Sequence, residues 1–217
     1  MSEKKFDFSR AGLTPDIADI NKPNESGYDQ PLVSEQADKL YDEMYKDDLT
    51  GAYNSKFLKK RIKEFNFDKE GPLCVAFIDV NNLKQVNDNF GHYEGNELLK
   101  NVVNIISNSI RISKGDQIFR VGGDEFVVLL SKLNISEDNT QDKITEVIKE
   151  KINNDKDIFN NENPGINVDF AMGFSFVDDK NENLEEAIKI ADEKMYQNKV
   201  ETKQPTNLLD LIDGDGI

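Results

Sequence analysis

The chain has 217 residues and carries 42 acidic against 27 basic side chains, which gives a formal net charge of −15 at pH 7. This balance excludes a long nucleic acid as the expected partner, because binding a phosphate backbone needs a basic groove. One cysteine, Cys74, and one histidine, His92, are too few for a disulfide, a thiolate metal site or a histidine-rich metal site.

The sequence also lacks membrane signals. No run of about 18 apolar residues occurs, and the charged start of the chain is followed by no hydrophobic signal region. We therefore expect no membrane insertion and a cytoplasmic location. At this length the chain can bury one good-sized core.

The first part of the chain divides into two segments. Three prolines, two glycines and few periodic apolar residues predict an irregular arm over residues 1–31. Apolar residues at 4-3-4 spacing then predict a helix over residues 32–46, carried by Val33, Ala37, Leu40 and Met44.

Helical and extended segments alternate over the next 150 or so residues. Apolar residues at helical spacing mark helices at 57–65, from Asn96 to 110, at 144–152 and at 184–195. Runs of β-formers mark a buried strand at 73–79, a hairpin at 117–131 and a strand at 168–177. Because the strands include an antiparallel hairpin, we predict an α+β fold with a mostly antiparallel central sheet flanked by helices.

The hairpin carries the most informative residues, Arg120-Val121-Gly122-Gly123-Asp124-Glu125-Phe126, between two apolar runs. A Gly-Gly centre predicts a tight turn, which would hold Asp124 and Glu125 at its tip. Gly-Gly-Asp is also a common hairpin turn without any further role. An upstream feature favours the functional interpretation, because the strand at 73–79 ends on Asp79. Three carboxylates brought together by a sheet would suit Mg²⁺.

Four motifs in order resemble the GGDEF family of diguanylate cyclases. They are Asp47-Asp48-Leu49-Thr50-Gly51-Ala52-Tyr53-Asn54, the segment from Asp79 to Asn96, the hairpin tip, and Ala191-Asp192-Glu193-Lys194-Met195-Tyr196 with Lys199. The resemblance covers residues 47–203, which we expect to form the catalytic domain, with an acidic tail at 204–217. It implies a ferredoxin-like palm of the nucleotide cyclase type. It also implies condensation of two GTP into cyclic di-GMP, with a homodimer as the catalytic form.

By resemblance, Asp79, the backbone carbonyl of Val80, and Asp124 hold two Mg²⁺ or Mn²⁺ ions per active site. Asp124 or Glu125 takes the proton of the attacking hydroxyl, and the sequence leaves the choice between them open. Lys84 is placed like the family lysine that stabilises the negative charge developing during phosphoryl transfer.

Further residues are expected to bind the nucleotide. Backbone N–H groups of the turn at Asn82 and Leu83 are expected to contact the phosphates. Lys199 and Lys203 match phosphate-binding residues of the family. Lys203 stands where the family usually has Arg, and a lysine cannot make the bidentate hydrogen bonds of a guanidinium group. Two roles stay open for His92: contact with the ribose or base, or shaping of the Gly-His turn through a backbone hydrogen bond.

Base selection is where the sequence departs from the family. The guanine-reading Asn and Asp align here with Asn87 and Asn96. An amide offers one acceptor and one donor, which also suits adenine, so ATP and mixed cyclic dinucleotides join GTP as candidate substrates. Asn96 has an alternative structural role as the cap of a helix beginning at Glu97.

A second departure concerns product inhibition. The family's inhibitory site needs Arg-x-x-Asp before the hairpin, and here that stretch reads Ser113-Lys114-Gly115-Asp116, with Arg111 two residues out of place. We predict no strong product inhibition through this site. Asp47 and Asp88 are expected to tie loops together.

Two alternatives to a cyclase stay open. A GGDEF-like module could hold GTP or a dinucleotide and regulate a partner without chemistry. The retention of Asp79, Asp124, Glu125 and Lys84 weighs against it. A polymerase-like or CRISPR-type palm shares the carboxylates but explains the Asn87-Asp88 and Gly91-His92 pattern less well.

Overall fold

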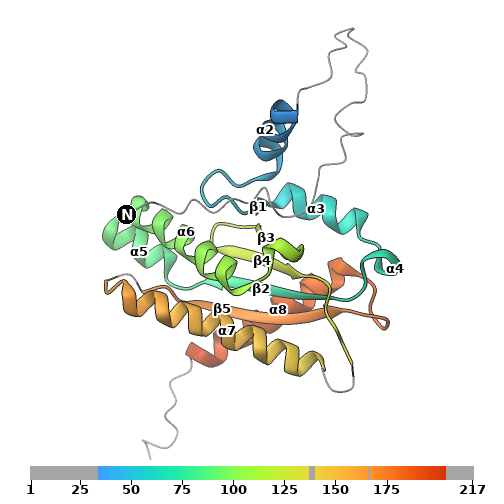
Figure 1. Ribbon diagram of the computed structural model, residues 1–217. Coiled ribbons are helices and arrows are strands. Elements are labelled where there is room, and N and C mark those ends of the chain that lie inside the picture. The colour runs from blue at the N-terminus through green and yellow to red at the C-terminus, as the bar shows by residue number, and fades with distance from the viewer. Residues whose placement is uncertain (1–33, 137–139, 166, 204–217) are drawn as a thin grey trace, which may run out of the picture.

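The computed structural model describes residues 34–136, 140–165 and 167–203, so the predicted arm at 1–31 and tail at 204–217 lie outside the described residues. Five strands form one sheet in the order β1-β3-β4-β2-β5 (Figure 1). The strands are β1 Tyr53–Asn54, β2 Leu73–Val80, β3 Gln117–Arg120, β4 Glu125–Leu130 and β5 Phe170–Val177. The helices are α2 Ser34–Tyr45, α3 Ser55–Glu64, α4 Phe67–Glu70, α5 Leu83–Phe90, α6 His92–Ser109, η2 Ile112–Lys114, α7 Gln141–Glu162 and α8 Leu184–Lys203.

The sheet is mostly antiparallel. Strand β2 lies between β4 and β5 and pairs antiparallel with both, and β3 pairs antiparallel with β4. Only the short β1 pairs parallel, with β3, among the described strands. The predicted α+β architecture is confirmed.

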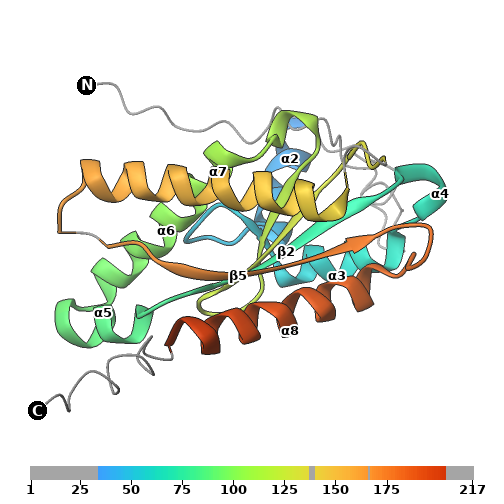
Figure 2. The same cartoon turned by 90° about the horizontal axis from the view of Figure 1, so that it is seen from below.

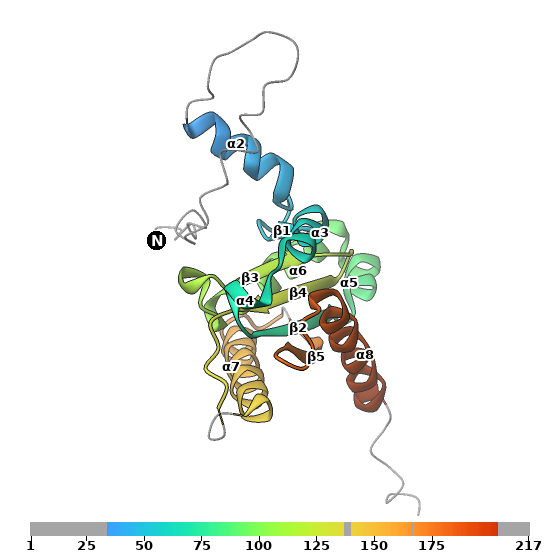
Figure 3. The same cartoon turned by 90° about the vertical axis from the view of Figure 1, so that its right-hand side faces the viewer.

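Helices cover both faces of the sheet. Because successive side chains of a strand point to opposite faces, the even-numbered residues of β2 pack under α6 and α7, whereas Leu73, Val75 and Phe77 pack with α3 and α8. Figures 2 and 3 show α7 and α8 on opposite sides of β2 and β5. All eight residues of β2 are buried, in agreement with a sequence that is apolar except for Asp79.

Helix α8 approaches the sheet very closely at Gly173 of β5. A Cβ atom on Gly173 would lie 2.1 Å from the Ala191 carbonyl oxygen and 2.2 Å from the Met195 backbone nitrogen. The missing side chain therefore allows the helix to rest on the strand. This contact brings the C-terminal part of α8, with Lys199, beside the end of β2 and near α5 (Figure 2).

Several elements differ from the predictions. Helix α5 and strand β1 were not predicted, and β5 begins at Phe170 instead of 168. Helix α6 begins at His92, because Gly91, with φ 90°, ends α5 and starts α6. The expected helix start at Asn96 is therefore wrong. No helix in the described ranges is long and apolar enough to cross a membrane.

Candidate functional site

The end of β2 and the tip of the β3–β4 hairpin meet at one corner of the sheet. The Cα of Asp79 lies directly opposite that of Glu125, and the backbone N–H of Val80 donates to the Asp124 carbonyl oxygen at 2.9 Å. This bond makes Val80 and Asp124 a hydrogen-bonded pair. Because hydrogen-bonded and non-hydrogen-bonded pairs alternate, Asp79 and Glu125 form a non-hydrogen-bonded pair, in which the Cα atoms typically lie about 4.5 Å apart. The expected meeting of strand end and hairpin tip is present.

Helix α8 supplies a cation to this corner. Asp79 and Glu125 share the sheet face of Phe77 and Val127, which α8 covers. The Lys199 ammonium group donates to Oδ1 of Asp79, and both side chains are mostly buried. Lys199 is therefore the direct counter-charge of the aspartate that ends β2.

The carboxylates of the corner repel one another. The pKa of Glu125 is raised, first by burial and then by the negative charges of Asp124, Asp79 and Asp192, while Lys199 opposes the shift. The pKa of Asp192 on α8 is raised by burial, by Glu193 and by Asp79. The corner therefore holds excess negative charge, which favours binding of a cation.

Gly122 leaves room for the Glu125 side chain. A Cβ atom on Gly122 would lie 2.3 Å from Oε2 of Glu125, so the glutamate folds back over the glycine. This contact gives the first glycine of the pair a steric role, because an alanine there would displace the carboxylate.

The donors at the corner fit a hard divalent cation by their chemistry, because all of them are carboxylate or backbone oxygens. In residues 34–136, 140–165 and 167–203, no three carboxylate, imidazole or thiol side chains stand close enough together to enclose a metal ion. Asp79 is instead paired with Lys199, and the Glu125 side chain folds over Gly122. Metal binding would require these side chains to reorient.

A pocket of about 480 Å³ opens beside the corner. It is formed by the turn after β2, by α5, by the hairpin tip and by α8. The lining residues are Val80, Asn81, Asn82, Leu83, Lys84, Gln85, Asp88, Asn89, Asp124 and Lys199. Six residues expected in the site thus share one pocket, namely Val80, Asn82, Leu83, Lys84, Asp124 and Lys199.

The turn at Asn82 has an unusual backbone conformation. Asn82 has φ 62° and lies directly before α5, where its side chain makes no capping hydrogen bond. The first N–H groups of a helix have no partner within the helix, so they remain available to an anion. The turn thus presents backbone donors and the exposed Lys84 to the pocket.

The residues expected to read the base lie on α5 and α6. The Asn87 side chain occupies the space beside Gly95, where a Cβ atom would lie 2.0 Å from Asn87 Oδ1. Asn96 is exposed inside α6, so the predicted capping role is wrong. His92 is exposed at the first residue of α6, and Lys203 is the last residue of α8.

Arg120 joins the hairpin to the loop before β1, a link that the sequence did not predict. Its Nη1 donates to the carboxylate of Asp47 at 3.1 and 3.3 Å, and its Nη2 donates to the Gly123 carbonyl oxygen at 2.7 Å. Asp47 also accepts from the backbone N–H and the hydroxyl of Thr50. Asp47 therefore ties its own loop, as predicted, and it also ties that loop to the hairpin turn.

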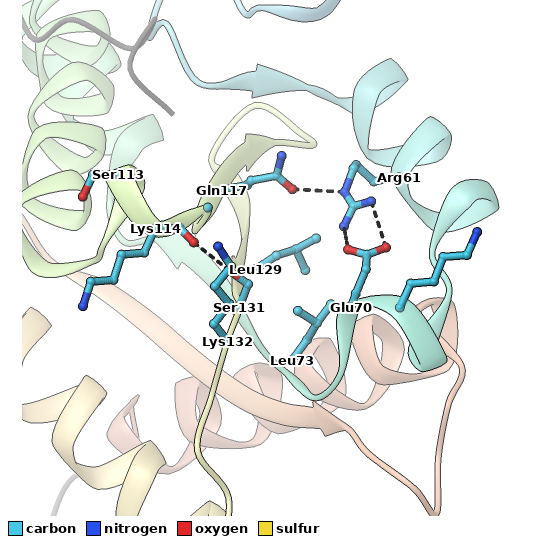
Figure 4. Close-up of a pocket in the computed structure, with 11 residues that line it drawn as sticks. Arg61, Glu70, Leu73, Ser113, Lys114, Gln117, Leu129, Ser131 and Lys132 are labelled. Atoms are coloured by element: carbon cyan, nitrogen blue, oxygen red, sulfur yellow. Dashed lines mark hydrogen bonds and ion pairs between the residues drawn. The ribbon is translucent and has the colours of Figure 1, made fainter. Parts of the chain in front are cut away.

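A second cavity, of about 320 Å³, is lined by Leu73, at the other end of β2 from Asp79, and by Leu129 of β4. Figure 4 shows the residues that line it. Its wall includes Arg61, which donates to Gln117 Oε1 at 3.1 Å and pairs with Glu70 at 2.7 Å (Figure 4). Lys114 and other residues before the hairpin line it too.

Asp116, beside this cavity, is fully engaged within the protein. It is 1% exposed, and its carboxylate accepts from the backbone N–H groups of Arg111 and Ser131 at 2.8 and 2.9 Å. The Arg111 side chain pairs with it at 3.2 Å. The aspartate is therefore a tie between two loops, with little capacity left for a ligand.

Comparisons with known proteins agree on one family. Residues 44–205 match the family described as "Diguanylate cyclase, GGDEF domain". Over 195 residues, 87% of the chain, it is 31% identical to the probable diguanylate cyclase DgcI of Escherichia coli. It is 35% identical over 159 residues, 69% of the chain, to the diguanylate cyclase DosC of the same species. The chain spans 40% and 32% of the lengths of these relatives.

Solved structures support the same fold. The GGDEF domain of TpbB, also called YfiN, from Pseudomonas aeruginosa aligns with a TM-score of 0.58 and 27% identity. The alignment covers 72% of this chain and 90% of that domain.

Proposed function

The chain belongs to the GGDEF-domain family of diguanylate cyclases, and from that premise we propose that it condenses two GTP into cyclic di-GMP with release of pyrophosphate. The observation that carries the proposal is the corner at which Asp79 faces Glu125 beside a pocket of about 480 Å³. Membership of this family also excludes the alternative of a polymerase-like palm, which the carboxylates alone left open.

The chain's own residues would bind and orient the triphosphate. Backbone N–H groups of the turn at Asn82 and Leu83 would contact the phosphate oxygens, because they lack partners at the start of α5. Lys84 and Lys199 line the same pocket and would offset the phosphate charge. Lys199 would then exchange part of its contact with Asp79 for the nucleotide, and Lys203 would add a further charge beyond it.

Asp79, the carbonyl of Val80, and Asp124 would hold Mg²⁺ or Mn²⁺, two ions per active site. When bound, the ions would neutralise charge on the attacking and leaving oxygens of phosphoryl transfer. Asp124 or Glu125 would accept the proton of the 3′-hydroxyl, and both are close enough to the corner for either assignment.

A homodimer is the proposed catalytic form. Each chain offers one nucleotide pocket beside one set of carboxylates, and a cyclic dinucleotide requires two nucleotides to face each other. Two copies related by a two-fold axis would bring two such pockets together.

GTP is the proposed substrate, with relaxed base choice as the finer proposal. Asn87 and Asn96 lie on adjacent helices, and Asn96 is exposed with no capping role to explain it. A neutral amide in place of a carboxylate can pair with adenine as well as guanine, because it offers one donor and one acceptor. We therefore propose that ATP also enters, yielding cyclic GMP-AMP or cyclic di-AMP alongside cyclic di-GMP.

The experiment is incubation with GTP, ATP or an equal mixture, with Mg²⁺ or Mn²⁺, followed by chromatography of the products. The wild-type protein should form cyclic di-GMP from GTP, and Asp124→Ala should form none while staying folded. Asn96→Asp should raise the preference for GTP over ATP. Products from GTP alone that are unchanged by Asn96→Asp would remove the proposal of relaxed base choice.

Metal-dependent GTP binding without any cyclic product would instead identify the chain as a regulatory module that lacks activity. Equilibrium binding of a GTP analogue, measured on the same samples, distinguishes that outcome from a misfolded preparation.

A further inference from the structure

Asp169 lies directly before β5, outside the motifs that point to the nucleotide site. It nevertheless contacts the turn that lines the pocket. The Asn81 backbone N–H donates to the Asp169 carbonyl oxygen at 2.9 Å, and Asn81 Nδ2 donates to Asp169 Oδ2 at 2.8 Å. Two hydrogen bonds thus join residues that are 88 positions apart in the chain.

The other oxygen of the Asp169 carboxylate faces α7. Oδ1 accepts from Lys156 Nζ at 3.3 Å, and the Lys156 side chain is only 17% exposed. The carboxylate therefore bridges a partly buried lysine and the side-chain amide of Asn81. This bridge fixes both the position of Asp169 and the direction in which the Asn81 amide points.

The orientation of Asn81 has a cost that the Asp169 contact offsets. Its Oδ1 is buried and has no hydrogen-bond partner among the described residues. Turning the amide over would place that oxygen against the Asp169 carboxylate, so the observed orientation is the one the bridge enforces. A buried polar atom without a partner is unfavourable, which implies that the hydrogen bond to Asp169 outweighs it.

The next residue shows what this anchoring holds in place. Asn82 adopts φ 62°, a left-handed conformation that costs free energy, although less for Asn than for most residues with a side chain, and it makes no capping hydrogen bond. Asn82 and the two residues after it, Leu83 and Lys84, line the pocket. Loss of the Asn81 anchor would let this strained turn relax.

We propose that Asp169 is a positioning residue, which acts through Asn81 to hold the phosphate-binding turn and which Lys156 orients. The inference rests on the proposed function, because it assigns nucleotide phosphates to this pocket. Asp79 and Val80 are held separately, by the pairing of β2 with β4 and β5 on both sides. Weakening the turn should therefore reduce nucleotide affinity, measured as Kd or KM, far more than it reduces kcat.

The test measures metal-dependent binding of a fluorescent GTP analogue, with kcat and KM for GTP measured in parallel. Asp169→Ala should weaken binding about tenfold, and Lys156→Met about threefold, because they remove a charged hydrogen-bond partner or its orientation. Asp169→Asn keeps an acceptor for Asn81 and should bind within about threefold of wild type. Asp169→Ala removes a negative charge near a triphosphate, which would by itself strengthen binding, so weaker binding of this variant cannot be a charge effect.

An exchange of the two residues gives a sharper test. Asn81→Asp alone sets two carboxylates against each other and should weaken binding about tenfold, because their repulsion displaces the turn. The double variant Asn81→Asp/Asp169→Asn restores a donor–acceptor pair with the same net charge as wild type. It should recover most of the lost affinity, a rescue that general destabilisation would not produce.

Asp155→Ala is the matched control. Asp155 on α7 accepts from the Ser109 hydroxyl at 2.6 Å, away from the pocket, so its loss should lower Tm without changing Kd. Unchanged Kd in Asp169→Ala, or no rescue in the double variant, would overturn the inference while wild-type cyclase activity still supports the proposed function. A wild-type protein that binds no GTP analogue would overturn both.

Discussion

Replacing Glu125 by Gln should stabilise the protein in metal-free buffer while abolishing cyclase activity. Glu125 faces Asp79 directly across the β2–β4 pair, and the Glu125 pKa is raised first by burial and then by the negative charges of Asp124 and Asp79. Two unit charges about 5 Å apart in a water-like dielectric repel by roughly 0.8 kcal/mol. The Lys199 ammonium group offsets part of this repulsion.

The net gain from Glu125→Gln is therefore about 0.5 kcal/mol, which corresponds to a Tm increase of about 1–2 °C for a domain of this size. The pH dependence follows from the sign of the shift. A carboxyl group whose pKa is raised on folding destabilises the folded state when it is ionised, and this penalty is fully present at a pH above the raised pKa. It disappears as the pH falls below the ordinary glutamate pKa, so the Tm difference between variant and wild type should close there.

The assay is thermal unfolding at low ionic strength with a chelator present, at pH 7 and near pH 4. Glu150→Gln, an exposed charge change on α7, is the matched control and should leave Tm unchanged. A Glu125→Gln protein that is no more stable than wild type at pH 7 would refute the repulsion argued for this corner.

Three further predictions concern other parts of the structure. Asp47→Ala should lower stability by about 1–3 kcal/mol in chemical denaturation and reduce activity, because Arg120 loses its charged partner; unaltered stability would contradict the tie. Gly173→Ala should destabilise by several kcal/mol, seen as a large Tm decrease, because a Cβ cannot fit 2.1 Å from the Ala191 oxygen; a normal Tm would mean that α8 can shift freely. Cys74 should resist a thiol reagent in the native state, because burial raises its pKa to about 12; rapid labelling without denaturant would show that β2 is accessible.

The main features of the fold followed from local sequence signals. The apolar run of β2 predicted one strand, and the Gly-Gly turn between two apolar runs predicted a hairpin of two more strands. The carboxylates fell at the ends of those elements, so antiparallel pairing brought Asp79 opposite Glu125. Because side chains alternate between the two faces along a strand, Asp79 and Glu125 both lie on the face that α8 covers.

The boundaries between α5 and α6 were harder to predict. Asn96 has a residue type common at helix starts, yet the start lies at His92 because Gly91 adopts φ 90°. The available sequence signal for this boundary was Gly91, which lies between two polar segments. Helix α5 is short, and its few apolar residues gave a weak helical pattern.

Long-range ties had no local signal. Asp169 and Asn81 lie 88 residues apart, and Arg120 and Asp47 lie 73 apart. Each pair consists of polar residues that look like ordinary surface in the sequence. Their roles depend on the order of strands in the sheet, which composition and periodicity do not determine.

The measurement that tests the central claim most directly is product analysis by mass spectrometry after incubation of the purified chain with GTP and Mg²⁺. The account predicts cyclic di-GMP together with two pyrophosphates per molecule of product, and none from a folded Asp79→Asn variant. No cyclic dinucleotide from wild type with either Mg²⁺ or Mn²⁺, or equal yield from Asp79→Asn, would contradict it.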